Sequence, residues 1–187
     1  MSSRRTLIAV LCSALTFSVA ASAGLTSIES GRFKLEGAAK PKIGPRLNFD
    51  GKGPVTAKEE GSTIVFETNL QKHLDMGERT EHAKEDFKCK KHPTAKLVVE
   101  KSAIKLPEDN KKTEGVVSGQ LTLHGQTKPV KVKYTASRTG SDFHVKSASF
   151  TFDYTEFGVT PICRFGKTIC VEPKVTVTVT GLKLRDK

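Results

Sequence analysis

The stretch GQLTLHGQTKPVKVKY, residues 119–134, decides the fold class of this chain. Apolar residues stand at alternate positions on both sides of a short joint, first at Leu121 and Leu123 and then from Val130 onward. The joint, residues 124–129, contains a glycine that can adopt positive φ and a proline that fixes φ. Two period-2 runs around such a joint predict an antiparallel hairpin with one apolar and one cationic face.

The same alternation recurs along the chain and predicts eight strands. In the seventh strand the early apolar positions are out of phase with the later ones, which predicts a bulge near Ser147. The eighth changes phase at Gly181. The predicted strands are residues 32–38, 46–51, 62–70, 95–106, 115–124, 128–138, 143–154 and 172–184. Turn signals separate them at 41–45, 51–54, 59–61, 107–110 and 139–142.

Strands with one apolar and one charged face need a cover for the apolar face. Closing the sheet provides that cover and removes exposed edges, so the pattern predicts an all-β, eight-stranded antiparallel barrel. A two-sheet sandwich is the alternative that periodicity leaves open. Residues 70–90 break the alternation, which predicts a short helical insertion between the third and fourth strands, over one end of the barrel. We expect Thr80 to cap a helix over residues 81–87 and His92-Pro93 to end the segment.

Residues 1–23 have the three parts of a secretory signal peptide. Arg4 and Arg5 form the basic start, residues 7–19 the short apolar stretch, and residues 21–23 the small-residue cleavage site. We expect cleavage near Ala23 and one exported domain over residues 24–187, periplasmic or secreted. No later segment is apolar enough to predict a membrane span.

The predicted mature chain is basic. Two of the 31 Lys and Arg residues lie in the leader, which leaves 29 against 20 Asp and Glu and a formal charge of +9. The lysines are scattered over alternate strand positions, as on a solvated barrel exterior; attraction to an anionic membrane surface or an acidic partner is the second interpretation. Nucleic acid is not expected, because the chain has no Trp and no basic patch interleaved with aromatic residues. The oligomeric state stays open, a homodimer included.

Three cysteines follow the leader: Cys89, Cys163 and Cys170. Export permits a disulfide, and we expect one between Cys163 and Cys170, which flank a stretch with a central glycine. Closing so short a loop removes little unfolded-state entropy, so the bond should order the loop more than it stabilises the fold. Cys89 is then a partly exposed free thiol, or it pairs with one of the other two. Its basic sequence neighbours favour the thiolate.

The sequence contains no recognisable catalytic or cofactor motif. No Ser, Cys or Thr stands in a nucleophile elbow, and no glycine-rich phosphate loop precedes a helix. His73 and His82 lie near acidic residues, but their spacing fits a polar helix surface better than a metal site. His124 falls on the polar side of its strand and is expected to hydrogen-bond in the turn. We therefore predict no catalytic residue, no metal and no cofactor, and a small exported hydrolase is the least favoured alternative.

The remaining candidate for function is the apolar interior. It is either a dry core or a cavity for one apolar ligand, and periodicity does not distinguish the two. Lysines near a mouth, such as Lys128 and Lys167, are candidates to hold a phosphate or carboxylate headgroup. The residues predicted to line the interior are Phe33, Leu35, Phe49, Phe66, Leu97, Val99, Leu121, Val132, Tyr134, Phe150, Phe152, Val175 and Val177.

Several segments resemble one known family, in the family's order. Residues 119–130, GQLTLHGQTKPV, resemble the G-x-L-T-l-h-G-x-T-k-P-v hallmark of YceI-like proteins. The segments RTEH (79–82), DF (86–87) and HPTA (92–95) resemble the family's helix, its acidic-aromatic step and the Y-P-x-A start of a strand. Residues 152–158 resemble its R-x-D-Y/F-G-I region, and Leu47, Phe49 and residues 175–182 match its strand positions by phase. The likeness covers nearly the whole predicted mature chain.

The resemblance implies a bacterial, mostly periplasmic or secreted, lipocalin-like barrel that binds polyisoprenoids and related amphiphiles, and not an enzyme. It favours a lipid cavity over a dry core, with sequestration or transport of an isoprenoid or fatty-acyl lipid as the function. The alternative is a non-enzymatic stress or interaction protein with a closed barrel core, which acts through its basic surface. Two places depart from the family pattern: Cys89, and the loop between Cys163 and Cys170, where many members have a plain glycine-rich connection. The second departure would reshape the mouth of the barrel.

Overall fold

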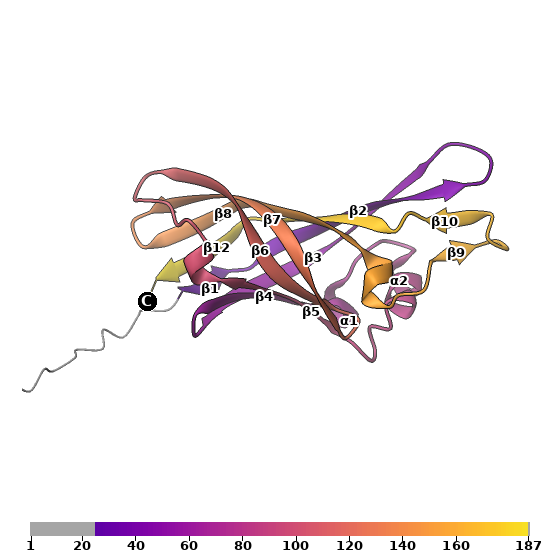
Figure 1. The fold of residues 1–187 in the computed structure, drawn as a ribbon, viewed down its shortest axis with the longest axis horizontal. Helices are drawn as coiled ribbons and strands as arrows, with labels where there is room; N and C mark the ends of the chain where they lie inside the picture. The colour runs from indigo at the N-terminus through magenta and orange to yellow at the C-terminus, as the bar shows by residue number, and fades with distance from the viewer. Residues whose placement is uncertain (1–24, 187) are drawn as a thin grey trace, which may run out of the picture.

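The fold is a closed antiparallel β-barrel, seen in a computed structural model that describes residues 25–186 (Figure 1). The predicted leader lies outside these residues. The eight long strands span Gly31–Pro41 (β2), Leu47–Glu60 (β3), Thr63–Asn69 (β4), Thr94–Glu100 (β5), Lys112–Leu123 (β6), Gln126–Thr139 (β7), Asp142–Asp153 (β8) and Lys174–Thr180 (β11). Each pairs with the next, and β11 pairs back with β2, which closes the ring. The predicted eight-stranded barrel is confirmed, and the sandwich is excluded.

Four short strands, which the sequence does not separate from the long ones, extend the ring at its two ends. At one end β1 (Leu25–Glu29) continues β2, and β12 (Leu182–Asp186) continues β11 past Gly181, whose φ is +69°. There β12 pairs with both β1 and β8. At the other end β10 (Ile169–Val171) pairs with β2 and with β9 (Cys163–Arg164). The predicted phase change at Gly181 is therefore the boundary between two strands.

The hairpin β6–β7 turns on two residues. Leu123 pairs with Gln126, and between them His124 and Gly125 have φ of 52° and 76°. Positive φ at both central positions is the type I′ geometry that matches the twist of the flanking strands. The predicted joint was longer, because residues 126–129 proved to be the start of β7.

The register between β7 and β8 contains the predicted bulge. Thr135 lies opposite Ser147, and the next residue, Ala136, lies opposite Val145. Lys146 is therefore the extra residue. The bulge reverses the alternation, so that Phe143 before it and Phe150 after it are both buried in the interior.

One predicted turn is wrong. Residues 51–54 lie inside β3 and pair with β2 throughout. Their glycines make room for side chains instead of turning the chain: an added Cβ would lie 2.6 Å from the Phe33 ring at Gly53 and 2.7 Å from Met76 at Gly51. Pro54 lies outside the β3–β4 pairing, which begins at residue 56, so its missing N–H interrupts no bond of that pairing.

The predicted strand 95–106 also ends early, at residue 100, and passes into the 3-10 turn η1 (Lys101–Ala103).

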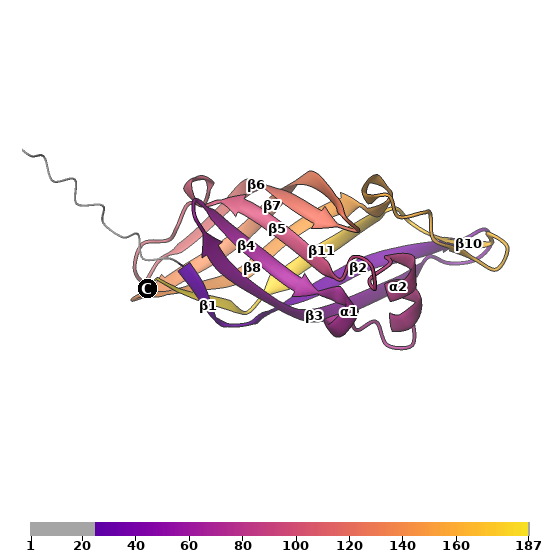
Figure 2. The same cartoon turned by 90° about the horizontal axis from the view of Figure 1, so that it is seen from below.

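The predicted insertion consists of two short helices, α1 (Leu70–His73) and α2 (Thr80–Asp86). The predicted capping role of Thr80 is wrong, because α2 begins at this residue. Its hydroxyl accepts the Met76 N–H at 2.8 Å and donates to the Gly77 carbonyl at 2.7 Å, which fixes the turn before the helix. Figure 2 shows both helices toward the end of the barrel that carries β10, away from the C-terminus. Across residues 25–186, no helix has both the length and the apolar character required to cross a bilayer.

Candidate functional site

The interior of the barrel is hollow. Its wall encloses a cavity of about 580 Å³, which lies within the range typical of ligand pockets. An eight-stranded ring is just wide enough for inward side chains and one small ligand. The dry core left open by the alternation pattern therefore does not describe this interior.

All thirteen residues predicted to line the interior lie on the cavity wall. Eight of them are buried among their neighbours: Phe33, Leu97, Val99, Leu121, Val132, Phe150, Phe152 and Val175. The other five, Leu35, Phe49, Phe66, Tyr134 and Val177, line the cavity as well and are only partly buried. The alternation of apolar residues therefore predicts which side chains line the interior. Whether a cavity remains between them depends on the distance between opposite strands.

Two apolar clusters flank the cavity. One contains Leu121 and Phe150, and the other contains Phe33 and Leu182. The partly buried side chains that pack against both clusters are Phe66, Leu70, Ile104, Ala148 and Val177. These five side chains therefore connect the two clusters, and a ligand in the cavity would contact residues of both.

One end of the barrel, carrying β1 and β12, is closed by apolar packing and charged pairs. Leu25 and Leu182 are each 1% exposed, and Leu184 is also buried. The Glu59 carboxylate accepts the Leu25 backbone N–H at 2.9 Å and pairs with Lys101 at 2.8 Å. The Lys101 hydrogen bond, followed by that from Leu25, holds the pKa of Glu59 below its usual range. We call this the closed end.

A second carboxylate ties β8 to β12 at the closed end. Asp142 accepts from Arg185 at 2.7 Å and pairs with Lys183 at 3.1 Å. Hydrogen bonds from these two cations hold the pKa of Asp142 well below its usual range.

The opposite end is the mouth of the cavity. The start of β3, α2 and the β9–β10 hairpin surround it. Five of the polar residues that line the cavity belong to these segments: Asn48, Arg79, His82, Asp86 and Arg164. Arg164 donates to Asp86 at 2.6 Å and so joins the hairpin to α2. Leu47 and Phe165 also line the mouth and are 44% and 79% exposed. The cavity thus has an apolar body and one open, polar end.

Neither Lys128 nor Lys167 lies on the cavity wall. Arg79 and His82 are the basic side chains of the wall that approach the mouth from the helical insertion. Sequence reasoning did not place these two side chains at the cavity, although a signal for Arg79 was present. Arg79, Ala83 and Phe87 are spaced by four residues and so share one face of a helix, and all three line the cavity.

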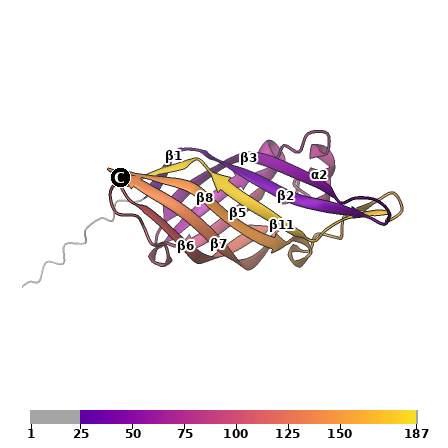
Figure 3. The same ribbon diagram turned by 90° about the horizontal axis from the view of Figure 1, so that it is seen from above.

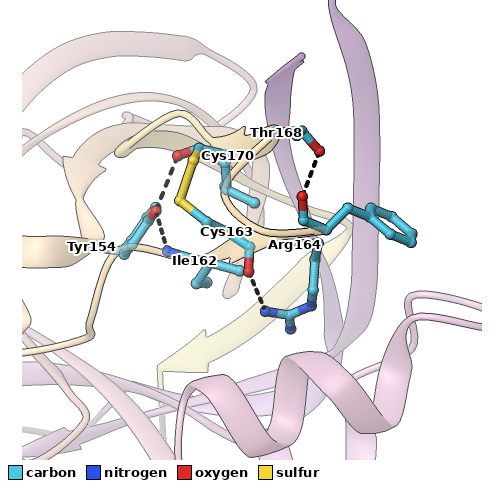
Figure 4. The surroundings of a disulfide bond; sticks show 8 residues. Tyr154, Ile162, Cys163, Arg164, Thr168 and Cys170 are labelled. Atoms are coloured by element: carbon cyan, nitrogen blue, oxygen red, sulfur yellow. Dashed lines mark hydrogen bonds between the residues drawn. A yellow bond between two sulfur atoms is a disulfide. The ribbon is translucent and has the colours of Figure 1, made fainter. Parts of the chain in front are cut away.

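The disulfide joins the two strands of the β9–β10 hairpin, whose Arg164 and Phe165 line the mouth (Figure 4). Cys163 and Cys170 stand opposite each other in the β9–β10 ladder, and their sulfurs are bonded. The base of this hairpin is held by Tyr154, which is 1% exposed: its hydroxyl donates to the Val171 carbonyl at 3.1 Å and accepts the Ile162 N–H at 3.3 Å. Burial raises the pKa of this tyrosine. The loop between Cys163 and Cys170 is therefore an ordered part of the mouth.

Of the two alternatives for Cys89, the free thiol is the one observed, but its expected partial exposure is wrong. Its side chain is 0% exposed and forms no disulfide with the other cysteines of the described chain. Burial raises the pKa of the thiol, and the positive charge of Lys84 offsets this only in part. Lys88 and Lys90, its neighbours in sequence, are exposed, so they do not activate it as a thiolate.

His124 connects three segments that are distant in sequence. Its Nδ1 lies 3.0 Å from the Phe157 carbonyl in the 3-10 turn η2 (Tyr154–Phe157), and its ring packs edge-on against His92. An added Cβ at Gly125 would lie 2.8 Å from the His92 ring. The hallmark hairpin, residues 92–95 and residues 152–158 therefore meet in space. The same segments carry the family resemblance.

The two histidines considered as metal ligands have different locations. His73 ends α1, whereas His82 lies on α2 at the mouth. Among residues 25–186, no three His, Cys, Asp or Glu side chains are grouped so that they could hold a metal ion.

Comparisons with known proteins agree with this geometry. A sequence model of the YceI-like domain family matches residues 13–181. The chain is similar to the structure of a polyisoprenoid binding domain from Saccharophagus degradans implicated in plant cell wall breakdown, at 10% identity and a TM-score of 0.66, over 89% of this chain and 99% of that one. It is also similar to Burkholderia cenocepacia BcnA, at 17% identity and a TM-score of 0.53, over 81% and 95%. No curated protein matches the sequence. At these identities, the two structures establish a shared fold.

Proposed function

The chain belongs to the YceI-like family, and we propose that it is an exported protein that binds a long apolar ligand inside its barrel and sequesters or transports it. The ligand class is a polyisoprenoid or a fatty-acyl amphiphile. The observation that carries the proposal is the cavity of about 580 Å³ with its apolar wall. The Saccharophagus degradans domain, which is named as polyisoprenoid binding, supports the ligand class.

The thirteen predicted wall residues would contact the apolar chain of the ligand. Burying one CH₂ group contributes about 0.8 kcal/mol, so ten groups contribute roughly 8 kcal/mol before the costs of association. Useful affinity therefore requires no hydrogen bond inside the barrel. Because the closed end is blocked and the mouth is polar, the ligand would enter tail first and leave its headgroup near Arg79 and His82.

Export and a binding role without catalysis are parts of the same proposal. The predicted leader supports export, as does the Cys163–Cys170 disulfide, because such bonds persist in oxidising compartments. The apolar wall favours retention of a ligand over chemical change of it.

Native mass spectrometry of the protein purified from an exporting host tests the proposal. We expect an adduct that solvent extraction releases as a long-chain lipid. Val177→Trp places a larger side chain on the cavity wall, reduces the space for a ligand and should lose the adduct, as should Phe66→Lys, which places a charge on the wall. Val116→Trp and Val116→Lys make the same changes at a side chain 61% exposed on β6 and should keep the adduct. A bare mass that does not change after incubation with isoprenoid and fatty-acid mixtures would contradict the proposal.

A further inference from the structure

The strands at the mouth continue beyond the barrel as a projecting extension. It consists of residues 39–47, from the β2–β3 connection, and residues 162–171, from the β9–β10 hairpin; we call it the mouth extension. Figures 1 and 3 show the two parts running in the same direction past the end of the ring. They are joined by the β10–β2 pairing and by a hydrogen bond from the Lys42 N–H to the Thr168 carbonyl at 2.8 Å.

Exposed apolar side chains are concentrated on this extension. The large apolar residues that the described chain exposes are Ile43, Leu47, Leu106, Val116 and Phe165. Three of these five belong to the mouth extension, where Ile43 is 94% and Phe165 is 79% exposed. Single exposed apolar residues are ordinary, but a group at the tips of joined loops indicates a binding surface.

The tip of the β9–β10 hairpin is held in one conformation. Phe165, Gly166 and Lys167 all have positive φ, which is uncommon for the two residues other than glycine. The Thr168 hydroxyl donates to the Phe165 carbonyl at 2.8 Å, and the disulfide closes the base of the loop. The exposed Phe165 ring is therefore presented by an ordered turn.

The charge of the mouth extension has one sign. Its two segments contain five cations and no Asp or Glu. Arg46 pairs with Glu172, and Arg164 pairs with Asp86. The other three, Lys40, Lys42 and Lys167, are exposed and form no ion pair with any carboxylate of residues 25–186.

We propose that the mouth extension is a docking surface for an anionic lipid bilayer, with Ile43 and Phe165 entering the interfacial region and the three lysines binding lipid phosphates. Bulky apolar side chains flanked by lysines are the combination that attaches proteins to anionic membranes. Leu47 and Phe165 also line the cavity, so docking turns the mouth toward the bilayer. Docking requires no bound ligand, so this proposal can be tested independently of what the cavity binds.

The absence of Trp from the chain allows a direct test. Phe165→Trp places a single fluorophore at the tip, and Val116→Trp places one at an exposed apolar position on the outer face of β6. With vesicles of equal parts phosphatidylglycerol and phosphatidylethanolamine, we expect a blue shift of Trp emission for Phe165→Trp only. Vesicles of phosphatidylcholine should give no shift.

Charge variants test the lysines by sedimentation with the same vesicles. Each interfacial lysine contributes about fivefold in partitioning, so Lys40→Gln, Lys42→Gln and Lys167→Gln together should weaken binding roughly a hundredfold at low salt. The matched control, Lys131→Gln, Lys133→Gln and Lys146→Gln, removes the same charge from exposed strand positions and should change binding little.

Several results would overturn the proposal. They are no binding of the unmodified protein to the anionic vesicles, an equal loss in the two triple variants, or the same shift for both Trp variants. A shift with neutral vesicles would remove the role of anionic lipid. A shift with soluble polyglutamate would assign the surface to an acidic partner, and a shift on concentrating the protein alone would assign it to a second copy of the chain.

Discussion

The closed end and the mouth of this barrel are extensions of the same strands, yet different forces hold them. At the closed end, β1 and β12 carry Leu25 and Leu182 into the interior, where both are 1% exposed. At the mouth, the strands leave the ring, and Phe165 is 79% exposed. The closed end relies on apolar burial and partly buried charged pairs, and the mouth on a disulfide and more exposed ion pairs.

This difference implies that most of the stability of the fold comes from residues away from the mouth of the proposed binding site. Burial of a Leu side chain contributes about 1.5–3 kcal/mol, whereas an exposed ion pair contributes about 0–1 kcal/mol. The mouth can therefore change its loops, the Cys163–Cys170 hairpin included, with little effect on the barrel. The closed end has no such freedom, because its residues complete the core.

The largest contrast should come from matched leucine truncations. Leu182→Ala removes a fully buried side chain and should lower the free energy of unfolding by about 2–5 kcal/mol. Leu47→Ala, at the mouth and 44% exposed, should cost less than about 1 kcal/mol. Urea unfolding followed by circular dichroism measures both, with an unchanged m-value as the sign that the same two states are compared. Equal losses for the two variants would erase the proposed distinction between the ends.

Removal of the disulfide should have an intermediate effect. In Cys163→Ser/Cys170→Ser the loop entropy lost on closure is at most about 2.5 kcal/mol, and local opening of the hairpin reduces what global unfolding registers. We expect the global transition to shift by less than about 2 kcal/mol, while proteolysis after Arg164 or Lys167 becomes faster. Use of the double variant leaves no unpaired thiol at the rim. A loss above about 4 kcal/mol would show that the mouth belongs to the cooperative core.

Much of this fold could be predicted because the alternation is a local property of the chain. The inward set from Phe33 to Val177, the bulge at Lys146 and the break at Gly181 all follow from counting every second residue. At Gly53 the sequence pattern alone gives the wrong prediction. A glycine next to a proline is typical of a turn, but here it lies in a strand because the Phe33 ring needs its space.

The hollow interior and the environment of Cys89 could not be predicted, because both depend on distances between segments that are remote in sequence. Whether side chains from opposite strands touch depends on the diameter of the closed barrel, and this diameter cannot be inferred from the sequence of any single strand. Cys89 has lysines on both sides in sequence, yet its side chain turns inward and those lysines turn outward. Leu25 was missed for a simpler reason: a short strand next to a leader has too few residues to show a period.

The smallest predicted effect concerns the charges at the closed end. Glu59 has a folded-state pKa below its ordinary value of 4.5, so its contribution to stability is complete above that pH and is lost as the pH falls through the folded-state pKa. Glu59→Gln removes the charge and should cost about 1–1.5 kcal/mol at neutral pH.

As the pH falls below 4.5 and then through the folded-state pKa, the difference between Glu59→Gln and the unmodified protein should shrink, because the carboxylate becomes protonated first in the unfolded state and then in the folded state. Urea midpoints measured at several pH values show this directly. Glu172→Gln, which breaks the exposed pair with Arg46 at the mouth, is the matched control and should cost less than about 0.5 kcal/mol. A loss at Glu172 as large as that at Glu59, or a Glu59 difference independent of pH, would mean that charge does not distinguish the two ends. In that case apolar burial alone accounts for the stability of the closed end.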